Sequence, residues 1–159
     1  MDDLAHPGFI TQAGTQLSKG IEAEVIANPF SGFNIVAGFA YNDSKITKGA
    51  TSVEGLRPAN SGPARLANLW MSYRIMHGGV QGLGFGVGGN YGSDSYQTNI
   101  QTFKFTIPSY TTVDATVFYD QPKYRIGFKL DNLTNEKYWS FRLAPQNPTR
   151  GTLSLSIKF

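Results

Sequence analysis

Two stretches of the chain have residue types and spacings that could do chemistry. Glu22 and Glu24 alternate with apolar residues, so an extended chain places both carboxylates on one face, as in an acid–base pair. Residues 84–89 match the G-x-G-x-x-G pattern of dinucleotide-binding loops, but residues 90–94 predict a strand end and a loop where such a site needs a helix. We therefore predict that these glycines face a crowded interior. We expect Arg or Lys on neighbouring strands to pair with the two glutamates.

Other catalytic or nucleic-acid-binding signals are weak. His6 and His77 have no Ser or Asp at the spacing of a catalytic triad or metal site, and the chain has no Cys. An enzyme would need a nucleophile and a base on adjacent positions, and none is found. The 14 basic and 11 acidic residues are scattered singly, which gives nucleic-acid binding no support. We predict a protein that is not an enzyme, has no cofactor or metal and does not bind nucleic acid.

Aromatic and cationic residues stand in the long polar segments of the chain. Such side chains could hold a bulky ligand, because aromatic rings bury large areas and attract cations. The alternative is that they only pack the loops. The candidate ligand contacts are Tyr96, Phe103, Phe105, Trp139, Phe141 and Arg142, with Tyr138 beside them.

Seven segments show the period-two alternation of half-buried strands, and no window shows helical periodicity. The last of them ends the chain, with Leu155, Ile157 and Phe159 on its apolar face. The pattern predicts an all-β fold, an antiparallel up-and-down meander. Its strands are expected near residues 21–25, 33–42, 63–75, 82–91, 110–119, 124–131 and 151–159, and the first is expected to begin as early as Phe9.

The connections between these segments alternate in length. Residues 28–32, 76–80 and 120–123 are short turns, whereas residues 44–62, 92–106 and 132–150 are long polar loops. All turns would then lie at one end of the sheet and all loops at the other. This arrangement is typical of transmembrane barrels of the outer membrane. The strands of about ten residues, the tyrosines at strand ends and the charges on the face opposite the apolar one are also typical of them.

Seven strands do not close a barrel, and an open sheet in lipid would leave unpaired backbone groups at both edges. The acidic N-terminus also lacks the shape of a signal peptide. We therefore expect the chain to be part of a longer one. Two alternatives remain open. One is a self-contained eight-stranded barrel of structural or adhesive type, with its eighth strand hidden in residues 1–19. The other is a soluble sandwich.

The order of several motifs resembles the C-terminal barrel segment of TonB-dependent siderophore receptors. Singly these motifs are weak, but together they run through nearly the whole chain. They are residues 20–24 (G-[VIL]-E-x-E), 36–47, 63–70, 82–89, 109–115, 131–138 (similar to NLFDKKYY) and the terminal Phe159.

The resemblance implies a 22-stranded barrel in the outer membrane of a Gram-negative cell, of which residues 1–159 would be the C-terminal portion. The N-terminal plug and the first barrel strands would lie outside this sequence. The implied ligand is an Fe(III)-siderophore complex. The implied partners are TonB, through the missing plug, outer-membrane lipid, and the barrel assembly machinery. For the last of these, Leu155, Ile157 and Phe159 would form the assembly signal.

Overall fold

The structure, a computed structural model, describes residues 14–159 and contains nine strands there. Residues 14–159 include no helix that is long and apolar enough to span a membrane. In chain order the strands are β1 (Thr15–Ala27), β2 (Phe33–Lys48), β3 (Arg65–Arg74), β4 (Leu83–Gly92), β5 (Ser95–Ile100), β6 (Phe103–Ile107), β7 (Tyr110–Asp120), β8 (Tyr124–Asp131) and β9 (Arg150–Ile157).

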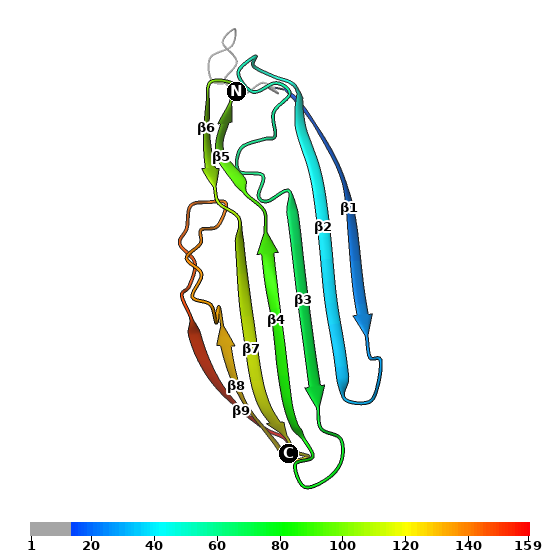
Figure 1. The fold of residues 1–159 in the computed structure, drawn as a ribbon. Coiled ribbons are helices and arrows are strands. Elements are labelled where there is room, and N and C mark those ends of the chain that lie inside the picture. The colour runs from blue at the N-terminus through cyan, green and yellow to red at the C-terminus, as the bar shows by residue number, and fades with distance from the viewer. Residues whose placement is uncertain (1–13) are drawn as a thin grey trace.

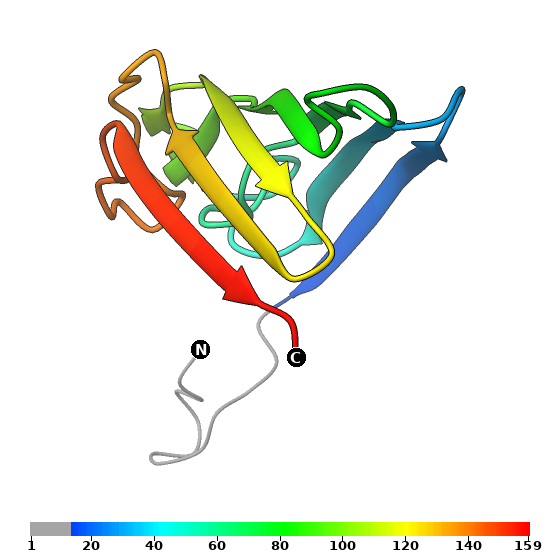
Figure 2. The same cartoon turned by 90° about the horizontal axis from the view of Figure 1, so that it is seen from below.

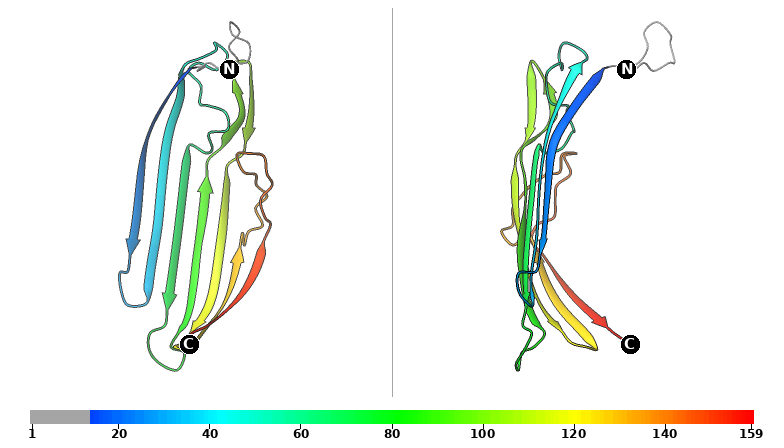
Figure 3. Two further views of the ribbon diagram at one scale, coloured as in Figure 1. Left: turned by 180° about the vertical axis from the view of Figure 1, so that it is seen from behind. Right: turned by 90° about the vertical axis from the view of Figure 1, so that its right-hand side faces the viewer.

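Seven strands form one curved antiparallel sheet in the order β1-β2-β3-β4-β7-β8-β9 (Figure 1). The predicted meander is confirmed, since each of these strands pairs with the sheet strand before it. Viewed along the strands, the sheet is an open arc with β1 and β9 at its two edges (Figure 2). The connections after β1, β3 and β7 lie at one end, here called the turn end. Those after β2, β4 and β8 lie at the other, the loop end (Figure 3).

The strand register places apolar residues in rows across one face of the sheet. Ile35 of β2 pairs with Met71, Met71 with Val87, Val87 with Ala115, and Ala115 with Leu130 of β8. A shift of one residue between any two strands would break this row, because successive side chains point to opposite faces. The face is therefore continuous from β2 to β8, and we call it the apolar face and its opposite the polar face.

The apolar face is not covered by protein in the described residues. Ile107 is the only buried hydrophobic residue among them, whereas Ile21 is 68% and Leu155 65% exposed. A soluble sandwich would cover such a face with a second large sheet, whereas the only other sheet in residues 14–159 is the two-stranded β5–β6 hairpin at the loop end. The sandwich alternative is therefore wrong. An uncovered apolar band on strands of about ten residues instead fits contact with lipid hydrocarbon.

The structure differs from the sequence-based strands at the loop end. β2 continues to Lys48 instead of ending near residue 42, and residues predicted as one polar loop contain the β5–β6 hairpin. The added part of β2 and the whole of β5 are mostly polar and do not alternate, whereas β6 alternates over only five residues. Polar contacts hold the extension, including a 2.9 Å hydrogen bond between Ser18 Oγ and Ser44 Oγ. The predicted start near Phe9 lies outside the described residues.

Candidate ligand-binding site

The polar face of β4 is a stripe of glycines covered by aromatic rings from both neighbouring strands. A Cβ built on Gly86 would lie 2.7 Å from Cζ2 of Trp70 on β3, and one on Gly84 would be closer still to the ring of Phe118 on β7. Any larger residue would displace these rings. The predicted crowded interior is confirmed for Gly84, Gly86 and Gly88, whereas Gly89 pairs with Leu69 and Val113 on the apolar face. Residues 84–89 are not a phosphate-binding loop, because they lie inside β4.

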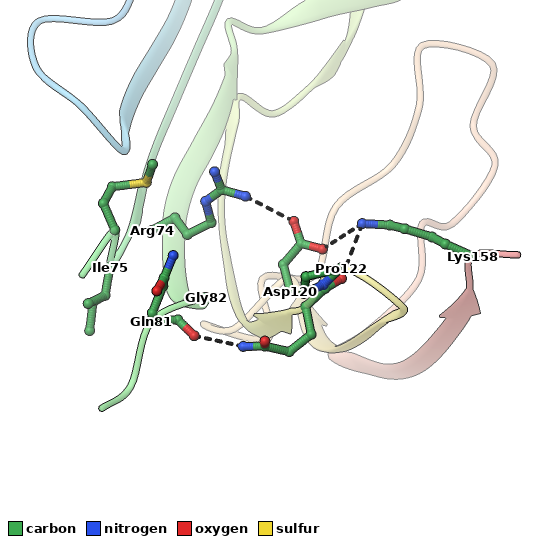
Figure 4. Close-up of a pocket in the computed structure, with 9 residues that line it drawn as sticks. Arg74, Ile75, Gln81, Gly82, Asp120, Pro122 and Lys158 are labelled. Atoms are coloured by element: carbon green, nitrogen blue, oxygen red, sulfur yellow. Dashed lines mark hydrogen bonds and ion pairs between the residues drawn. The ribbon is translucent and has the colours of Figure 1, made fainter. Parts of the chain in front are cut away.

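Four charged side chains, Arg74, Asp120, Arg125 and Lys158, meet on the polar face at the turn end, and we call them the Asp120 cluster. Figure 4 shows Arg74, Asp120 and Lys158. Asp120 Oδ2 accepts a hydrogen bond from Arg74 Nη1 at 3.2 Å and lies 3.9 Å from Arg125 Nη1, while Asp120 Oδ1 accepts one from Lys158 Nζ at 3.1 Å. Arg74 reaches β7 across the intervening strand because its partner on β4 is Gly84, which has no side chain. Arg74, Asp120 and Lys158 line a pocket of about 330 Å³.

The glutamates of β1 lie on the polar face but are not paired as predicted. The β2 residues opposite Glu22 and Glu24 are Ala40 and Gly38, and neither glutamate has an ion-pair partner among residues 14–159. For the one neighbouring strand that the structure describes, the predicted pairing with a cation is wrong. Nor does any group of three or more His, Asp or Glu within the described range have the geometry of a metal site.

At the loop end, one buried residue organises the connection from residue 132 to residue 149. The Asn132 side chain donates to the carbonyls of Glu136 (2.9 Å) and Asn147 (3.1 Å) and accepts from the Glu136 amide (2.9 Å). Its own amide donates to Asp114 Oδ1 at 2.8 Å. Its φ of 51° is in the left-handed region, which asparagine tolerates better than most residues. Asn132 therefore ties both halves of this loop to β7.

Beside this connection, three long connections enclose a small aromatic pocket of about 170 Å³. Tyr110 at the start of β7 stacks on Tyr138, with ring centroids 4.4 Å apart and an interplanar angle of 26°. Burial raises the pKa of the Tyr138 hydroxyl above its usual value, and the nearby Tyr110 and Asp114 act in the same direction. The other lining residues are Pro63, Ser93, Ser95, Ile107, Pro108, Trp139, Ser140, Phe141 and Gln146.

The structure brings only some of the predicted ligand contacts together. Trp139 and Phe141 line the aromatic pocket, and the Arg142 guanidinium lies 5.3 Å from the Phe141 ring centroid. The other three predicted contacts lie on the β5–β6 hairpin and do not line the aromatic pocket. Tyr96 is on β5, while Phe103 and Phe105 are exposed on β6.

Sequence reasoning missed one aromatic residue of the pocket, Tyr110, as well as its non-aromatic lining. The alternation predicts Tyr110 only as a strand residue, and its place at the loop end of the polar face was the available signal.

The hairpin and the preceding loop are joined by hydrogen bonds. The Asn60 amide donates to the Tyr96 carbonyl, and the Gln101 amide to the Ser52 carbonyl, both at 2.8 Å. Asn99 Nδ2, on the buried side of the hairpin, donates to the Arg57 carbonyl at 2.7 Å. Residues 52–60 therefore run along β5, so a ligand at the loop end would meet one connected surface.

The three residues of the predicted assembly signal lie at the free edge of the sheet. Leu155 and Ile157 are on the apolar face of β9, paired with Ile126 and Tyr124 of β8. Phe159 follows the strand and is fully exposed at the turn end. The other edge of β9 is not paired with any strand of residues 14–159.

Comparison with known proteins agrees with this architecture. The family model described as "TonB dependent receptor-like, beta-barrel" matches residues 2–133. The chain belongs to this family of TonB-dependent receptor barrels, and its sheet lies in the outer membrane. In outer-membrane barrels the short turns face the periplasm and the long loops the cell exterior. The aromatic pocket is thus external and the Asp120 cluster periplasmic.

Individual TonB-dependent receptors are similar along most of the chain. It is 32% identical over 135 residues to the ferrichrome outer membrane transporter/phage receptor of Escherichia coli, covering 82% of this chain and 18% of that protein. The ferrioxamine B receptor of Salmonella typhimurium is 31% identical, with 76% and 18% covered. Among solved structures, the ferric preacinetobactin receptor BauA from Acinetobacter baumannii matches with a TM-score of 0.77 and 26% identity, covering 94% of this chain and 23% of that one. The chain spans about a fifth of the length of these relatives.

Proposed function

We propose that the chain is the C-terminal part of a longer receptor that imports ferric-siderophore complexes across the outer membrane. The proposal is supported by membership of the TonB-dependent receptor family and by relatives named as ferrichrome and ferrioxamine B receptors. The chain would supply barrel wall and outer loops and carry out no chemistry. Transport would depend on TonB, acting through an N-terminal plug in the rest of the receptor.

The aromatic pocket at the loop end is the observation that best supports a ligand-binding site in this chain. Aromatic rings offer large, rigid contact areas, and the Tyr110–Tyr138 stack already fixes two of them. We propose that Trp139 and Phe141 contact the siderophore from this pocket, and that Arg142 attracts its charge. Tyr96, Phe103 and Phe105 would contact it from the hairpin.

The test is binding of ⁵⁵Fe-loaded ferrichrome and ferrioxamine B to the full-length purified receptor. Trp139→Ala and Phe141→Ala should each raise the Kd about three- to tenfold, the loss expected for one aromatic contact. Phe30→Ala is the matched control, because Phe30 is also an exposed aromatic but stacks on Phe33 at the turn end. Equal losses in all three variants would contradict the site, and binding of neither complex by the wild-type receptor would contradict the ligand assignment.

We also propose that Leu155, Ile157 and Phe159 are recognised by the barrel assembly machinery. Their place on an edge strand that still lacks one neighbour supports this, because that edge must pair during barrel closure. Removal of Phe159 should lower the amount of receptor in the outer membrane, measured by heat-dependent gel migration. Phe30→Ala should not lower this amount. Equal amounts of receptor in the wild type, the strain without Phe159 and the Phe30→Ala strain would refute the role of Phe159 in assembly.

A further inference from the structure

The alternation of β9 does not by itself fix the register of this edge strand. From Thr152 to Ile157, small hydroxyl residues alternate with Leu or Ile. A shift of two residues along β8 would therefore leave the apolar and polar faces of β9 intact. All eight residues of β9 are exposed, so interlocking side chains do not select one register either. Other contacts must hold β9 in the register that the structure shows.

Ion pairs are present at both ends of β9. At the loop end, Arg150 Nη2 lies 3.3 Å from Asp131 Oδ2 of β8. At the turn end, Lys158 Nζ donates to Asp120 Oδ1 at 3.1 Å, and the Lys158 amide donates to the Lys123 carbonyl at 2.9 Å. A shift of β9 in either direction would separate both ion pairs, because each residue of shift moves a side chain by about 3.3 Å.

Shifts of two residues would also bring like charges opposite each other. In the observed register, two cations of β8, Arg125 and Lys129, face hydroxyl residues of β9. A shift of β9 toward the loop end would put Lys158 opposite Arg125, and a shift toward the turn end would put Arg150 opposite Lys129. Like charges directly opposite each other destabilise a strand pair. The alternation thus permits both shifted registers, whereas the charges oppose both.

We propose that Arg150 and Lys158 set the register of β9. Each attracts an aspartate in the observed register, and each faces a cation in one of the shifted registers. The register also decides where Phe159 lies, since a shift of two residues would move it by about 7 Å. In a barrel the stagger between strands is fixed, so a shifted β9 would meet its next neighbour out of step. The inference goes beyond the proposed import and requires only that β9 belong to a barrel wall.

The turn end depends on charge more than the loop end does. At the loop end, Thr149 Oγ1 donates to the Asn132 carbonyl at 2.7 Å, and this bond would also resist a shift. At the turn end, Lys158 makes the side-chain contacts, and its Nζ also lies 3.4 Å from the Gln121 carbonyl. We therefore expect Lys158 to have a larger effect on the register than Arg150.

The test is disulfide cross-linking of the full-length receptor in a cysteine-free background. Gly127 faces Ser154 in the observed register, so Gly127→Cys with Ser154→Cys should form a disulfide. Gly127→Cys with Ser156→Cys reports the shift toward the loop end, and Gly127→Cys with Thr152→Cys reports the shift toward the turn end. Residues two apart on neighbouring strands lie about 7–8 Å from each other, which is too far for a disulfide unless β9 shifts.

The two charge reversals should shift β9 in opposite directions. Lys158→Glu should raise the share of the Gly127–Ser156 disulfide about tenfold, because the native contact becomes repulsive and the shifted one attractive. Arg150→Glu should raise the Gly127–Thr152 disulfide about threefold, because the bond of Thr149 still resists the shift. Lys158→Gln removes the charge without reversing it. It should give about a threefold rise, and it serves as the test if Lys158→Glu is not inserted into the membrane.

The matched control is Lys137→Glu, which makes the same charge change at an exposed position in the connection before β9. It should leave both shifted disulfides within about twofold of wild type. The proposal would be overturned by unchanged disulfides in the Lys158 and Arg150 variants, by shifts in the opposite directions, or by equal rises in the control. The assay uses no siderophore, so failure of the receptor to bind one would count against the proposed function alone.

Discussion

The two ends of the sheet are held by different kinds of interaction. At the turn end, Asp120 gathers three cations whose side chains are half exposed. At the loop end, Asn132 is buried and makes directional hydrogen bonds to backbone groups, next to the stacked Tyr110 and Tyr138. The first arrangement depends on charge and is sensitive to salt, whereas the second depends on geometry. The external end is therefore held by directional bonds, while the periplasmic end is held mainly by charge.

The strongest test of this contrast is Asn132→Ala. The change leaves the Glu136 amide and the Asn147 carbonyl without their partners, at a cost of about 3 kcal/mol to local stability. Amide hydrogen exchange in residues 133–149 of the full-length receptor should accelerate by roughly a hundredfold. Asn147→Ala is the control, because Asn147 contributes its backbone carbonyl to Asn132. Similar protection in both variants would show that Asn132 does not hold the loop.

A smaller effect is expected when the turn-end cluster loses its carboxylate. Asp120→Asn leaves Arg74, Arg125 and Lys158 repelling one another and should cost about 1–2 kcal/mol, since the cations are partly screened by solvent. The quantity to measure is the Tm of the full-length receptor in detergent. The deficit should shrink as salt is raised to about 1 M, where the screening length falls to roughly 3 Å. A deficit that salt does not change would mean that the cluster acts through packing.

Removing one ring of the aromatic stack should have a milder effect. Tyr110→Ala deletes the partner of Tyr138 and should raise the Kd for a bound siderophore about three- to tenfold. Tyr110→Phe keeps the stack and should lie close to wild type. If both substitutions weaken binding equally, the Tyr110 hydroxyl and not its ring is responsible.

The smallest effect is expected from an isolated ion pair outside both regions. Asp43 and Lys45 lie 3.7 Å apart on the exposed extension of β2. Asp43→Asn should change stability by no more than about 0.5 kcal/mol, because exposed pairs gain little in water. A Tm shift as large as that of Asp120→Asn would show that burial at the turn end is not what gives Asp120 its effect.

The sheet could be predicted from sequence where lipid dictates the pattern. Residues such as Met71 and Val87 alternate with polar ones because one side of each strand meets hydrocarbon, and the predicted faces agree with the register. The β5–β6 hairpin was missed because β5 is mostly polar and β6, although it alternates, has only five residues.

Contacts that depend on the strand register, or on a loop that folds back, could not be predicted from the sequence either. Arg74 and Asp120 are 46 residues apart and meet only because a glycine strand lies between theirs. The bonds of Asn132 require that residue 147 return to it. Trp139 and Phe141 could be named from their residue types, but the part that Tyr110 plays in their pocket could not.

Because the strands differ in length, the external edge of the described sheet is uneven in height. β2 has 16 residues and β8 has eight, so at about 3.3 Å per residue they are roughly 53 and 26 Å long. The wall therefore stands high on the side of β1 and β2 and low on the side of β8 and β9 (Figure 1). The connection that carries Trp139 and Phe141 follows β8, at the low side. The aromatic pocket therefore opens beside the lower part of the described wall, and the longest strand, β2, belongs to the higher part.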